Sequence, residues 1–474
     1  MKIVALIDEA YKKWKYKEFV FEKINDKYVG ITYGDFINKS KKLGRRLIND
    51  GFKNKRILLI GKNSKEYMIS DLAVLAYVGV CVNVNAQTTE IELKDIIDSM
   101  GINLVIYDED LRITIDKVKN ETNDIKFLCM QEIIDHSNSE YEGEAFEEKD
   151  EDVCSKIIFS SGTTSMPKGI MLSVRNIFSG WNSLIKRAPF TENEVIYLFL
   201  PLHHTYADIY NFLFSFLSGF QIYLASSIEN IGKELLEVNP TIFCAVPLIY
   251  KKIFIAAGDK LKYAFGNRID YLFCGGAFFD REIKKYYKDV GLPIMEAYAL
   301  TETSSSFAIE YKNSDDLESS GTIFEDIDVK IDNPNEDGVG DIVVKGENVF
   351  IGYVNNENLT KKVFNKDGYF ITGDLGCIIE NRLHLKGRKD TVLIGDNGEN
   401  VYPKEIENKL KLLSENILKV KCFLKEGKLT CNIYVKPECD INIIEIIDKY
   451  NEQVVKKDKI YNYFIKEGIG TELK

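Results

Sequence analysis

Ser160-Ser-Gly-Thr-Thr-Ser-Met-Pro-Lys-Gly169 is the segment from which the architecture of this chain can be predicted. It follows a short apolar run, Ile157–Phe159, that is typical of a strand. A loop with hydroxyls, glycines and one lysine at a strand end can hold phosphate, because its backbone N–H groups turn inward and Lys168 neutralises charge. No Gly-Lys-Ser/Thr ends the loop, so it is not a Walker A loop.

Short apolar runs alternate with longer amphipathic ones on both sides of this loop. Such alternation predicts parallel strands joined by crossover helices. In the first third we expect helices at about 65–78 and 90–100, with Thr32 capping an earlier one. The expected strands are Ile57–Ile60, Val80–Val84, Leu104–Tyr107, Ile157–Phe159, Ile196–Leu200, Gln221–Ala225, Thr241–Ala245, Tyr271–Cys274 and Ile294–Tyr298.

The pattern changes twice toward the C-terminus. From about residue 322 to 386, short strands and turns such as Asp337-Gly338 predict a β-rich subdomain. A compact α+β module follows, with a helix expected to begin at Pro403. The predicted fold is therefore α/β, with two alternating β/α parallel-type sheets and a β-rich subdomain in residues 1–387. A small C-terminal domain spans residues 388–474. The acidic stretch from Asp135 to Asp152 is interpreted as a solvated linker.

Composition narrows the class of protein. The 474 residues are 45% hydrophobic and 28% charged, as in globular proteins, and the net charge is −11. An acidic chain argues against a nucleic-acid partner, which usually leaves a basic footprint, but not against a nucleotide. The count of nine cysteines is odd and no Cys-x-x-Cys occurs, so a disulfide framework or zinc site is not expected.

The location of the protein is predicted from two features, the N-terminal sequence and the length of the most apolar span. The N-terminus has no signal-peptide h-region. The most apolar span, Ile209–Ala225, is short for a transmembrane segment and contains Asn211 and Gln221, so a buried helix and strand are expected instead. We expect a cytoplasmic protein with no transmembrane segment.

Three further motifs follow predicted strands. In Tyr298-Ala-Leu-Thr301-Glu302 an aromatic ring can stack on a base, while the hydroxyl and carboxylate can reach phosphate and Mg²⁺. Gly275-Gly276-Ala277 offers bare backbone to a flat ligand. In Thr372-Gly373-Asp374 the aspartate can accept hydrogen bonds from both ribose hydroxyls.

The order of these motifs resembles the adenylate-forming (AMP-binding) superfamily of acyl-CoA synthetases, adenylation domains and luciferases. The resemblance covers nearly the whole chain. Within the superfamily the chain looks most like the long-chain fatty acyl-CoA synthetases. That second likeness is carried by Leu200-Pro-Leu-His-His204-Thr-Tyr206, Asn239-Pro-Thr241, Ala245-Val-Pro247 and Gly398-Glu-Asn-Val-Tyr-Pro403.

The resemblance implies ATP and Mg²⁺ as cofactors. Lys168, Thr163 and Thr164 would hold the outer phosphates, Thr301 would contact the α-phosphate and Glu302 would coordinate Mg²⁺. Tyr298 would stack on adenine. The implied ATP-binding residues are Ser160, Ser161, Gly162, Thr163, Thr164, Gly275, Gly276, Ala277, Tyr298, Asp374 and Arg388.

The same resemblance implies the remaining parts of the site. His204, Gly276 and Ser304 would contact the acyl substrate, and Asp390 would be the hinge of a mobile C-terminal domain. His204 stands where amino-acid-activating relatives carry an aspartate, so the acid is not expected to be an α-amino acid. Gly395, Gly398, Glu399 and Asn400 would line a thiol tunnel. The implied catalytic residues are Lys168, His204, Thr301, Glu302 and Lys474, although Lys474 can equally be a surface residue of the tail.

The expected reaction is ATP-dependent activation of a carboxylic acid to an acyl-adenylate, followed by transfer to a pantetheine thiol. The expected enzyme is an acid–thiol ligase that forms AMP and pyrophosphate. Its partners would be a small carboxylic acid and either coenzyme A or a separate acyl carrier protein. An alternative from another class is a nucleotide-binding homologue without catalysis. Departures from the family pattern at Ser165, Ala299 and the C-terminus favour that alternative.

Overall fold

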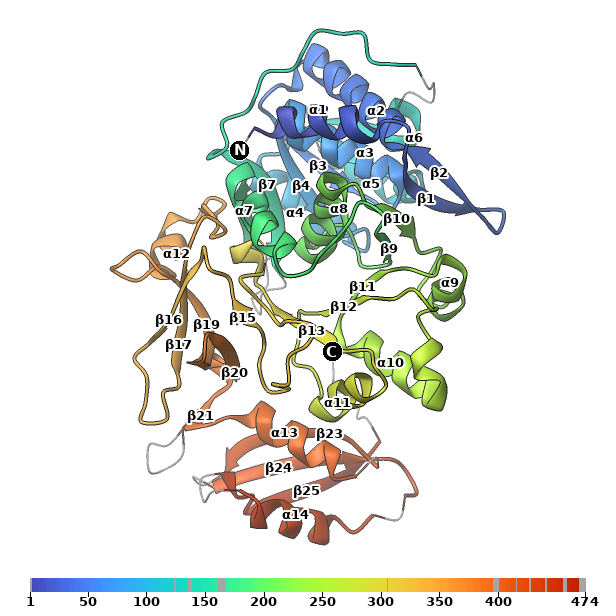
Figure 1. The fold of residues 1–474 in the computed structure, drawn as a ribbon. Coiled ribbons are helices and arrows are strands. Elements are labelled where there is room, and N and C mark those ends of the chain that lie inside the picture. The colour runs from blue at the N-terminus through green and yellow to red at the C-terminus, as the bar shows by residue number, and fades with distance from the viewer. Residues whose placement is uncertain are drawn as a thin grey trace.

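The structure is a computed structural model of the chain, and Figure 1 shows its arrangement. It describes residues 2–122, 125–134, 139–160, 168–304, 306–394, 400–414, 416–425, 428–439, 441–454 and 458–468. Two large sheets form the body, and a separate α+β module lies beyond one end of it (Figure 1). The predicted fold class is confirmed.

A seven-stranded sheet carries the phosphate-loop strand near its centre. Its order is β18-β8-β7-β4-β3-β5-β6, and the five strands from β7 to β6 are parallel. The strands are β3 (Arg56–Ile60), β4 (Val80–Val84), β5 (Leu104–Tyr107), β6 (Lys126–Cys129), β7 (Cys154–Ser160), β8 (Lys168–Ser173) and β18 (Gly352–Tyr353).

Helices connect and cover these parallel strands. Thr32 caps its helix as predicted, because its side chain accepts a hydrogen bond from the Asp35 N–H. Thr89 and Glu92 form a complete capping box at the start of another. The helices are α1 (Ile3–Trp14), α2 (Tyr33–Leu47), α3 (Lys65–Ala73), α4 (Glu90–Met100), α5 (Arg112–Glu121) and α6 (Met130–Ile133).

The acidic segment expected to be a solvated linker has no helix or strand from residue 139 to 150, and most of these residues are exposed, but it also contacts the body. It arches over α1 and α2 at the top of Figure 1. The Glu148 carboxylate accepts from the N–H groups of Val4 and Ala5 at 3.1 and 2.8 Å, which satisfies the first turn of α1. Phe146 stacks on Tyr77 with ring centroids 4.1 Å apart. We call residues 139–150 the belt.

A thirteen-stranded sheet forms the rest of the body, and half of it is parallel. Its order is β16-β17-β19-β20-β15-β14-β13-β12-β11-β9-β10-β1-β2, with parallel pairing from β13 to β1. The strands of this half are β1 (Glu18–Ile24), β9 (Val195–Leu198), β10 (Gln221–Leu224), β11 (Ile242–Ala245), β12 (Tyr271–Cys274) and β13 (Ile294–Tyr298). β2 (Lys27–Thr32) adds an antiparallel edge strand next to β1.

The helices of this half include a π-helical segment beside the central strands. The apolar span Ile209–Ala225 forms the end of that segment, a buried helix and a buried strand, as expected. The helices are α7 (Val174–Ile185), the π-helical η4 (Tyr206–Leu213), α8 (Phe214–Ser218), α9 (Ile231–Val238), α10 (Pro247–Ala257) and α11 (Arg281–Asp289).

The other half of the sheet is antiparallel and corresponds to the predicted β-rich subdomain. It continues directly from the parallel half, because β13 pairs with β14 and β14 with β15. Its elements are β14 (Ala308–Ile309), β15 (Thr322–Ile323), β16 (Asp328–Asp332), β17 (Gly340–Lys345), β19 (Phe370–Ile379), β20 (Arg382–Arg388) and, nearby, α12 (Glu357–Lys362).

The C-terminal module has a hydrophobic core of its own. Leu410, Cys431 and Ile433 are completely buried in it. Proline opens its first helix, as predicted. Its elements are β21 (Leu393–Ile394), β22 (Asn400–Val401), α13 (Pro403–Leu412), β23 (Ile417–Lys425), β24 (Lys428–Val435), α14 (Ile443–Glu452) and β25 (Asn462–Glu467).

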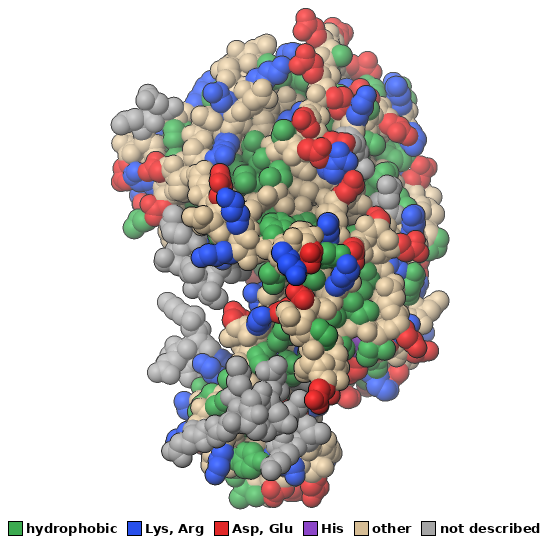
Figure 2. Space-filling model, turned by 90° about the vertical axis from the view of Figure 1, so that its left-hand side faces the viewer, with side chains coloured by type: hydrophobic (Ala, Val, Ile, Leu, Met, Phe, Trp, Pro, Cys, Tyr) green, Lys and Arg blue, Asp and Glu red, His purple; other side chains and the backbone are tan. Residues whose placement is uncertain are grey.

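The charge distribution on the surface bears on the expectation of no nucleic-acid partner, and the lengths of the helices bear on the expectation of no transmembrane segment. On the face shown in Figure 2, acidic and basic side chains are interspersed over the body. Within the described ranges, no helix combines the length and apolarity needed to cross a bilayer. The cytoplasmic location stays a prediction.

Candidate active site

The phosphate-loop segment joins two antiparallel strands of the seven-stranded sheet. Ser160 at the end of β7 pairs in register with Lys168 at the start of β8. The hairpin therefore places the Lys168 side chain beside the expected phosphate position. The predicted ATP-binding residues Ser161, Gly162, Thr163 and Thr164, like Ser165, lie outside the described residues.

A tyrosine joins the predicted lysine to the predicted magnesium ligand. The Lys168 ammonium lies 5.7 Å from the centroid of the Tyr353 ring. The Tyr353 hydroxyl donates to Glu302 Oε1 at 3.0 Å. Burial, followed by the Glu302 charge, raises the pKa of Tyr353, so its hydroxyl stays protonated and donates. Lys168 and Glu302, 134 positions apart in sequence, thus belong to one cluster.

Sequence reasoning missed Tyr353. Strand β18 pairs with β8 so that Tyr353 lies opposite Ile170, two residues after Lys168. The Phe350 N–H also donates to the Glu302 carbonyl at 2.8 Å. The sequence signal for this residue is the Gly352-Tyr353 pair inside the predicted β-rich subdomain, and such a pair is a weak pattern on its own.

Glu302 can serve as the Mg²⁺ ligand that the resemblance implies. It lies in a short 3₁₀ turn, Thr301–Thr303, and its side chain is half-buried. A carboxylate oxygen is the hard ligand that Mg²⁺ prefers, and the neighbouring Lys168 would share a bound phosphate. Thr301, the expected contact of the α-phosphate, is the first residue of the same turn and therefore lies next to Glu302.

The residues expected to hold adenine and ribose contact each other directly. The Tyr298 hydroxyl donates to Asp374 Oδ2 at 2.5 Å, and Arg388 Nε lies 3.3 Å from the other carboxylate oxygen. Strand pairing sets this geometry, because Asp374 on β19 lies opposite Arg388 on β20. Burial raises the pKa of Asp374, while the Tyr298 and Arg388 contacts oppose that shift. Gly373 has φ +77°, and a Cβ there would lie 3.1 Å from Arg388 Nη2.

Bare backbone lies at the end of β12, as predicted. Gly276 has φ +83°, which an L side chain rarely adopts. A Cβ on Gly275 would lie 3.2 Å from the Ala297 carbonyl oxygen and 3.9 Å from the Tyr206 ring. Gly275 therefore lies close both to the end of β13 and to the helical segment that begins at Tyr206. Ala277 follows directly on the exposed side.

His204 lies in a large polar cleft between the two sheets. The cleft has an empty volume of about 1720 Å³ and is also lined by Asn63, Gln87 and Asp108. Burial lowers the pKa of His204, and burial followed by the His204 charge lowers that of His203 to about 4. Both imidazoles are therefore neutral at neutral pH and can act as uncharged donors or acceptors.

Tyr206, two residues after His204, faces a different space. An apolar cavity with an empty volume of about 390 Å³, here called the first cavity, lies between the parallel strands and the helices η4 and α7. No Asp, Glu, Lys, Arg or His is among the described residues that line it. Its wall includes Leu184, Phe190, Ile196, Tyr206, Phe273 and Ala297.

Ser304, an expected acyl contact, has an unusual backbone. Its φ is +53°, and its side chain is 1% exposed. Its Oγ has no hydrogen-bond partner among the described residues. A strained residue with an unpaired buried hydroxyl is a common feature of ligand sites.

The remaining predicted residues belong to the C-terminal part. Asp390 lies in the turn Lys389–Thr391 that follows β20, where its carboxylate is 3.7 Å from Arg388 Nε. Asn400 starts β22. Gly395, Gly398, Glu399 and Lys474 lie outside the described residues.

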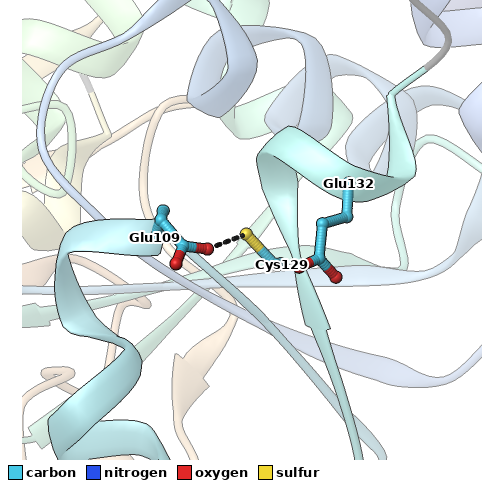
Figure 3. Close-up of side chains that lie close together, drawn as sticks. All are labelled: Glu109, Cys129 and Glu132. Atoms are coloured by element: carbon cyan, nitrogen blue, oxygen red, sulfur yellow. Dashed lines mark hydrogen bonds between the residues drawn. The ribbon is translucent and has the colours of Figure 1, made fainter.

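A second group of possible metal ligands lies away from this site. Glu109, Cys129 and Glu132 approach one another at the ends of β5 and β6 (Figure 3). Arg112 already contacts both carboxylates at 2.5 Å. The two carboxylates therefore share one arginine as their ion-pair partner, and the group is better explained as an ion-pair cluster.

Comparison with known proteins identifies the family. A family model described as AMP-binding enzyme matches residues 7–354. The chain belongs to this family. The match includes every described cluster residue from Lys168 to Tyr353. The resemblance expected from the motif order is thereby confirmed, and with it the expectation of an enzyme.

Relatives and solved structures cover most of the chain. Long-chain-fatty-acid–CoA ligase ACSBG2 of Gallus gallus is 24% identical over 86% of this chain and 63% of its own length. The Rattus norvegicus protein of the same name is 24% identical over 96% and 80%. The chain thus spans about two thirds to four fifths of these relatives.

Two crystal structures share the fold. ATP-bound MatB from Rhodopseudomonas palustris superimposes with a TM-score of 0.86 at 22% identity, covering 98% of this chain and 95% of MatB. o-Succinylbenzoate CoA synthetase (MenE) from Bacillus subtilis, in complex with its acyl-adenylate, gives 0.82 at 20% identity, with 97% and 94% covered. Another MenE structure contains ATP and a magnesium ion.

Proposed function

We propose that this chain uses ATP to activate a carboxylic acid with an apolar tail, forming an acyl-adenylate and pyrophosphate. The acyl group would then pass to a pantetheine thiol, with release of AMP. The observation that carries the proposal is the Lys168–Tyr353–Glu302 cluster, which joins a phosphate-loop lysine to a metal-binding carboxylate. The Tyr298–Asp374–Arg388 group would hold the nucleoside beside it.

The chain's own residues would act by binding and orienting two anions that repel each other in water. Lys168 would neutralise phosphate charge as it develops, and Thr301 would contact the α-phosphate. Mg²⁺, when bound at Glu302, would stabilise further negative charge on the phosphates. His204, neutral and at the cleft side of Tyr206, would contact the carboxylate end of the acid without adding a charge.

The apolar tail is supported by the first cavity. A second carboxylate or an amine on the tail would be desolvated there without a charged partner among the described residues. Burial raises the pKa of the Cys244 thiol in its wall to about 12, which keeps this thiol uncharged as well. The relatives named as long-chain-fatty-acid ligases agree with a fatty acid, and a medium-chain or aryl acid fits the same lining.

The thiol would reach the site from the polar cleft or along the loop at Gly395–Asn400. Its source would be coenzyme A or a separate acyl carrier protein, since both present pantetheine. We propose residues 1–387 as the adenylation core and residues 388–474 as a domain that rotates about Asp390 between the two steps. Lys474 would support the first step from the end of that domain.

Hydroxylamine trapping tests the proposal directly. Purified protein is incubated with ATP, Mg²⁺, hydroxylamine and straight-chain or aryl acids of graded size, and hydroxamate and pyrophosphate are measured. Equal amounts of both products are expected with acids whose tails are uncharged. ATP binding without either product, across the whole panel, would instead support a nucleotide-binding homologue without catalysis. Adding coenzyme A or a pantetheinylated carrier to reactions without hydroxylamine, and measuring AMP, separates the acceptors.

A further inference from the structure

A second apolar cavity lies directly behind the first cavity. It has an empty volume of about 280 Å³ and is lined from α7 by Ile177, Phe178 and Trp181. Leu184, Tyr210 and Phe214 line both cavities. These three side chains therefore form the wall between the first cavity and the second cavity.

Tyr210 is the part of that wall held by a polar contact. Its hydroxyl accepts a hydrogen bond from the backbone N–H of Ser306. Ser306 is 3% exposed, so this N–H has no ready access to water. Tyr210 also meets Tyr206 edge to face, with centroids 6.1 Å apart. The ring is thus fixed across the end of the first cavity by one bond and one ring contact.

The two sides of this contact differ in rigidity. Ser306 precedes Phe307, whose N–H donates to the Tyr298 carbonyl at 3.2 Å and whose ring packs on Tyr298 at 4.9 Å. That side is fixed to the sheet at the nucleotide residues. Tyr210 lies in the π-helical segment η4, and such segments are frequent at functional sites. Movement on opening would therefore occur at the Tyr210 side chain.

We propose that Tyr210 is a specificity-determining residue that closes the acyl site at a set chain length, and that its displacement joins the first cavity to the second. The inference rests on the proposed function, because it assigns the first cavity to the acyl tail. Acids that end before Tyr210 fill the first cavity and leave its bond to Ser306 intact. Longer acids must break that bond before their ends can enter the second cavity.

The consequence is a break in the dependence of activity on chain length. Below the break, each added methylene raises kcat/KM by about fourfold through apolar burial. At the break the next methylene gains nothing, because the Tyr210–Ser306 bond must be lost. Past it the rise resumes until the second cavity is filled.

Two substitutions of Tyr210 test this gate. Hydroxamate formation is measured with straight-chain acids from two to sixteen carbons, using wild type, Tyr210→Phe and Tyr210→Ala. The Phe variant keeps the ring but loses the hydrogen bond, so acids beyond the break should gain about 3- to 10-fold relative to shorter ones. The Ala variant should remove the break altogether. If the Ala variant does not fold, the Tyr210→Phe variant still tests the proposal, because it keeps the ring.

Tyr206→Phe is the matched control. It removes a hydroxyl from the same helix and the same cavity, but that hydroxyl donates to the Phe273 carbonyl at 3.1 Å and is not part of the wall. The position of the break should not move in this variant. Ile177→Ala, which changes only the second cavity, should affect only acids longer than the break.

The outcomes separate the two proposals. Acids activated with the same length profile in wild type and both Tyr210 variants would overturn the gate and leave the proposed function standing. No hydroxamate from any acid would overturn the proposed function, and the gate with it. Calorimetry with acyl-sulfamoyl adenosines of graded length gives an independent reading, since the same break should appear in Kd.

Discussion

At the scale of single residues, Tyr353 connects the two halves of the expected phosphate site. It donates to Glu302 and lies under the Lys168 ammonium, so the positions of a cation and an anion are fixed through one ring. A tyrosine in this place can order both groups without adding charge. The cluster therefore has the polarity that a magnesium–triphosphate complex requires, with oxygen ligand and ammonium on either side.

Glu302→Gln should reduce adenylate formation by roughly 10²-fold or more, because the variant removes one charge-stabilising group. Glutamine is nearly the same size and can still accept from Tyr353, so the fold should be preserved. The measurement is pyrophosphate release at limiting Mg²⁺. Glu347→Gln is the control, since it removes one exposed carboxylate whose ion pair among the described residues is with Arg175, at 3.2 Å. Near-normal rates for Glu302→Gln would refute the metal role.

A buried charge cluster lies behind the site. Lys156 Nζ contacts Asp71 Oδ1 at 2.8 Å and also Asp208 Oδ2, and all three side chains are fully buried. Lys156 is four residues before Ser160, and Asp208 is four residues after His204. Burial, followed by the charge of Asp71, raises the pKa of Asp208 to about 7. The cluster thus joins β7, the strand before the predicted phosphate loop, to the π-helical segment η4.

Lys156→Met should lower the free energy of unfolding by about 3–5 kcal/mol at pH 8, because two buried carboxylates lose their shared cation. The loss should shrink toward pH 5, where Asp208 is protonated in the folded state. Urea denaturation at both pH values measures it. Lys156→Met/Asp208→Asn should recover stability relative to the single variant, and a double variant less stable than the single one would contradict the charge explanation.

Sequence reasoning found the residues that lie in contiguous motifs and missed those paired only through space. Lys168, Tyr298, Glu302 and Asp374 each belong to a short motif next to an apolar run, so the sequence alone indicated them; Asp374, expected after its strand, lies within β19. Tyr353 is 51 positions from its partner Glu302, and β18 is only two residues long. Lys156 resembles a surface lysine in sequence, because a period-two pattern does not reveal that both faces of β7 are covered.

At the scale of elements, strand bounds were predicted well where apolar runs end at turn residues. Val80–Val84, Leu104–Tyr107 and Tyr271–Cys274 have the predicted limits. The belt was not predicted, because its contacts come from single side chains spaced along an irregular segment. Lys149 in the belt donates to the carbonyls of Leu75 and Gly79 at 2.9 and 2.6 Å, at the end of the helix that follows α3.

The belt gives a pH-dependent stability. Burial lowers the pKa of Lys149 to about 8, below its ordinary 10.5. Between these two values the unfolded chain binds a proton that the folded protein releases, so stability rises with pH there and is lowest below pH 8. The melting temperature of wild type minus that of Lys149→Met should therefore increase from pH 7.5 to pH 10. If the difference in melting temperature between wild type and Lys149→Met stays constant over this pH range, the pKa of Lys149 is not lowered in the folded protein.

At the scale of the whole molecule, the proposed function depends on how the C-terminal module meets the body. The body and the module each have their own core, and the chain passes between them at the turn Lys389–Thr391. The family resemblance implies a hinge at Asp390. The boundary between residues 387 and 388, like the rotation itself, stays a prediction, because it concerns a second arrangement of the same two parts.

Asp390→Pro tests the rotation. Proline fixes φ near −65°, which suits one arrangement of the turn and resists the change that a rotation requires. Adenylate formation and thioester formation should therefore separate, with one step reduced by at least about tenfold and the other little changed. Pyrophosphate release measures the first step, and thioester formation from supplied acyl-adenylate measures the second. Asp390→Ala removes the same carboxylate but leaves φ free, so it should affect the two steps equally. An equal loss of both steps in the proline variant would place the hinge elsewhere and leave the active-site assignments unaffected.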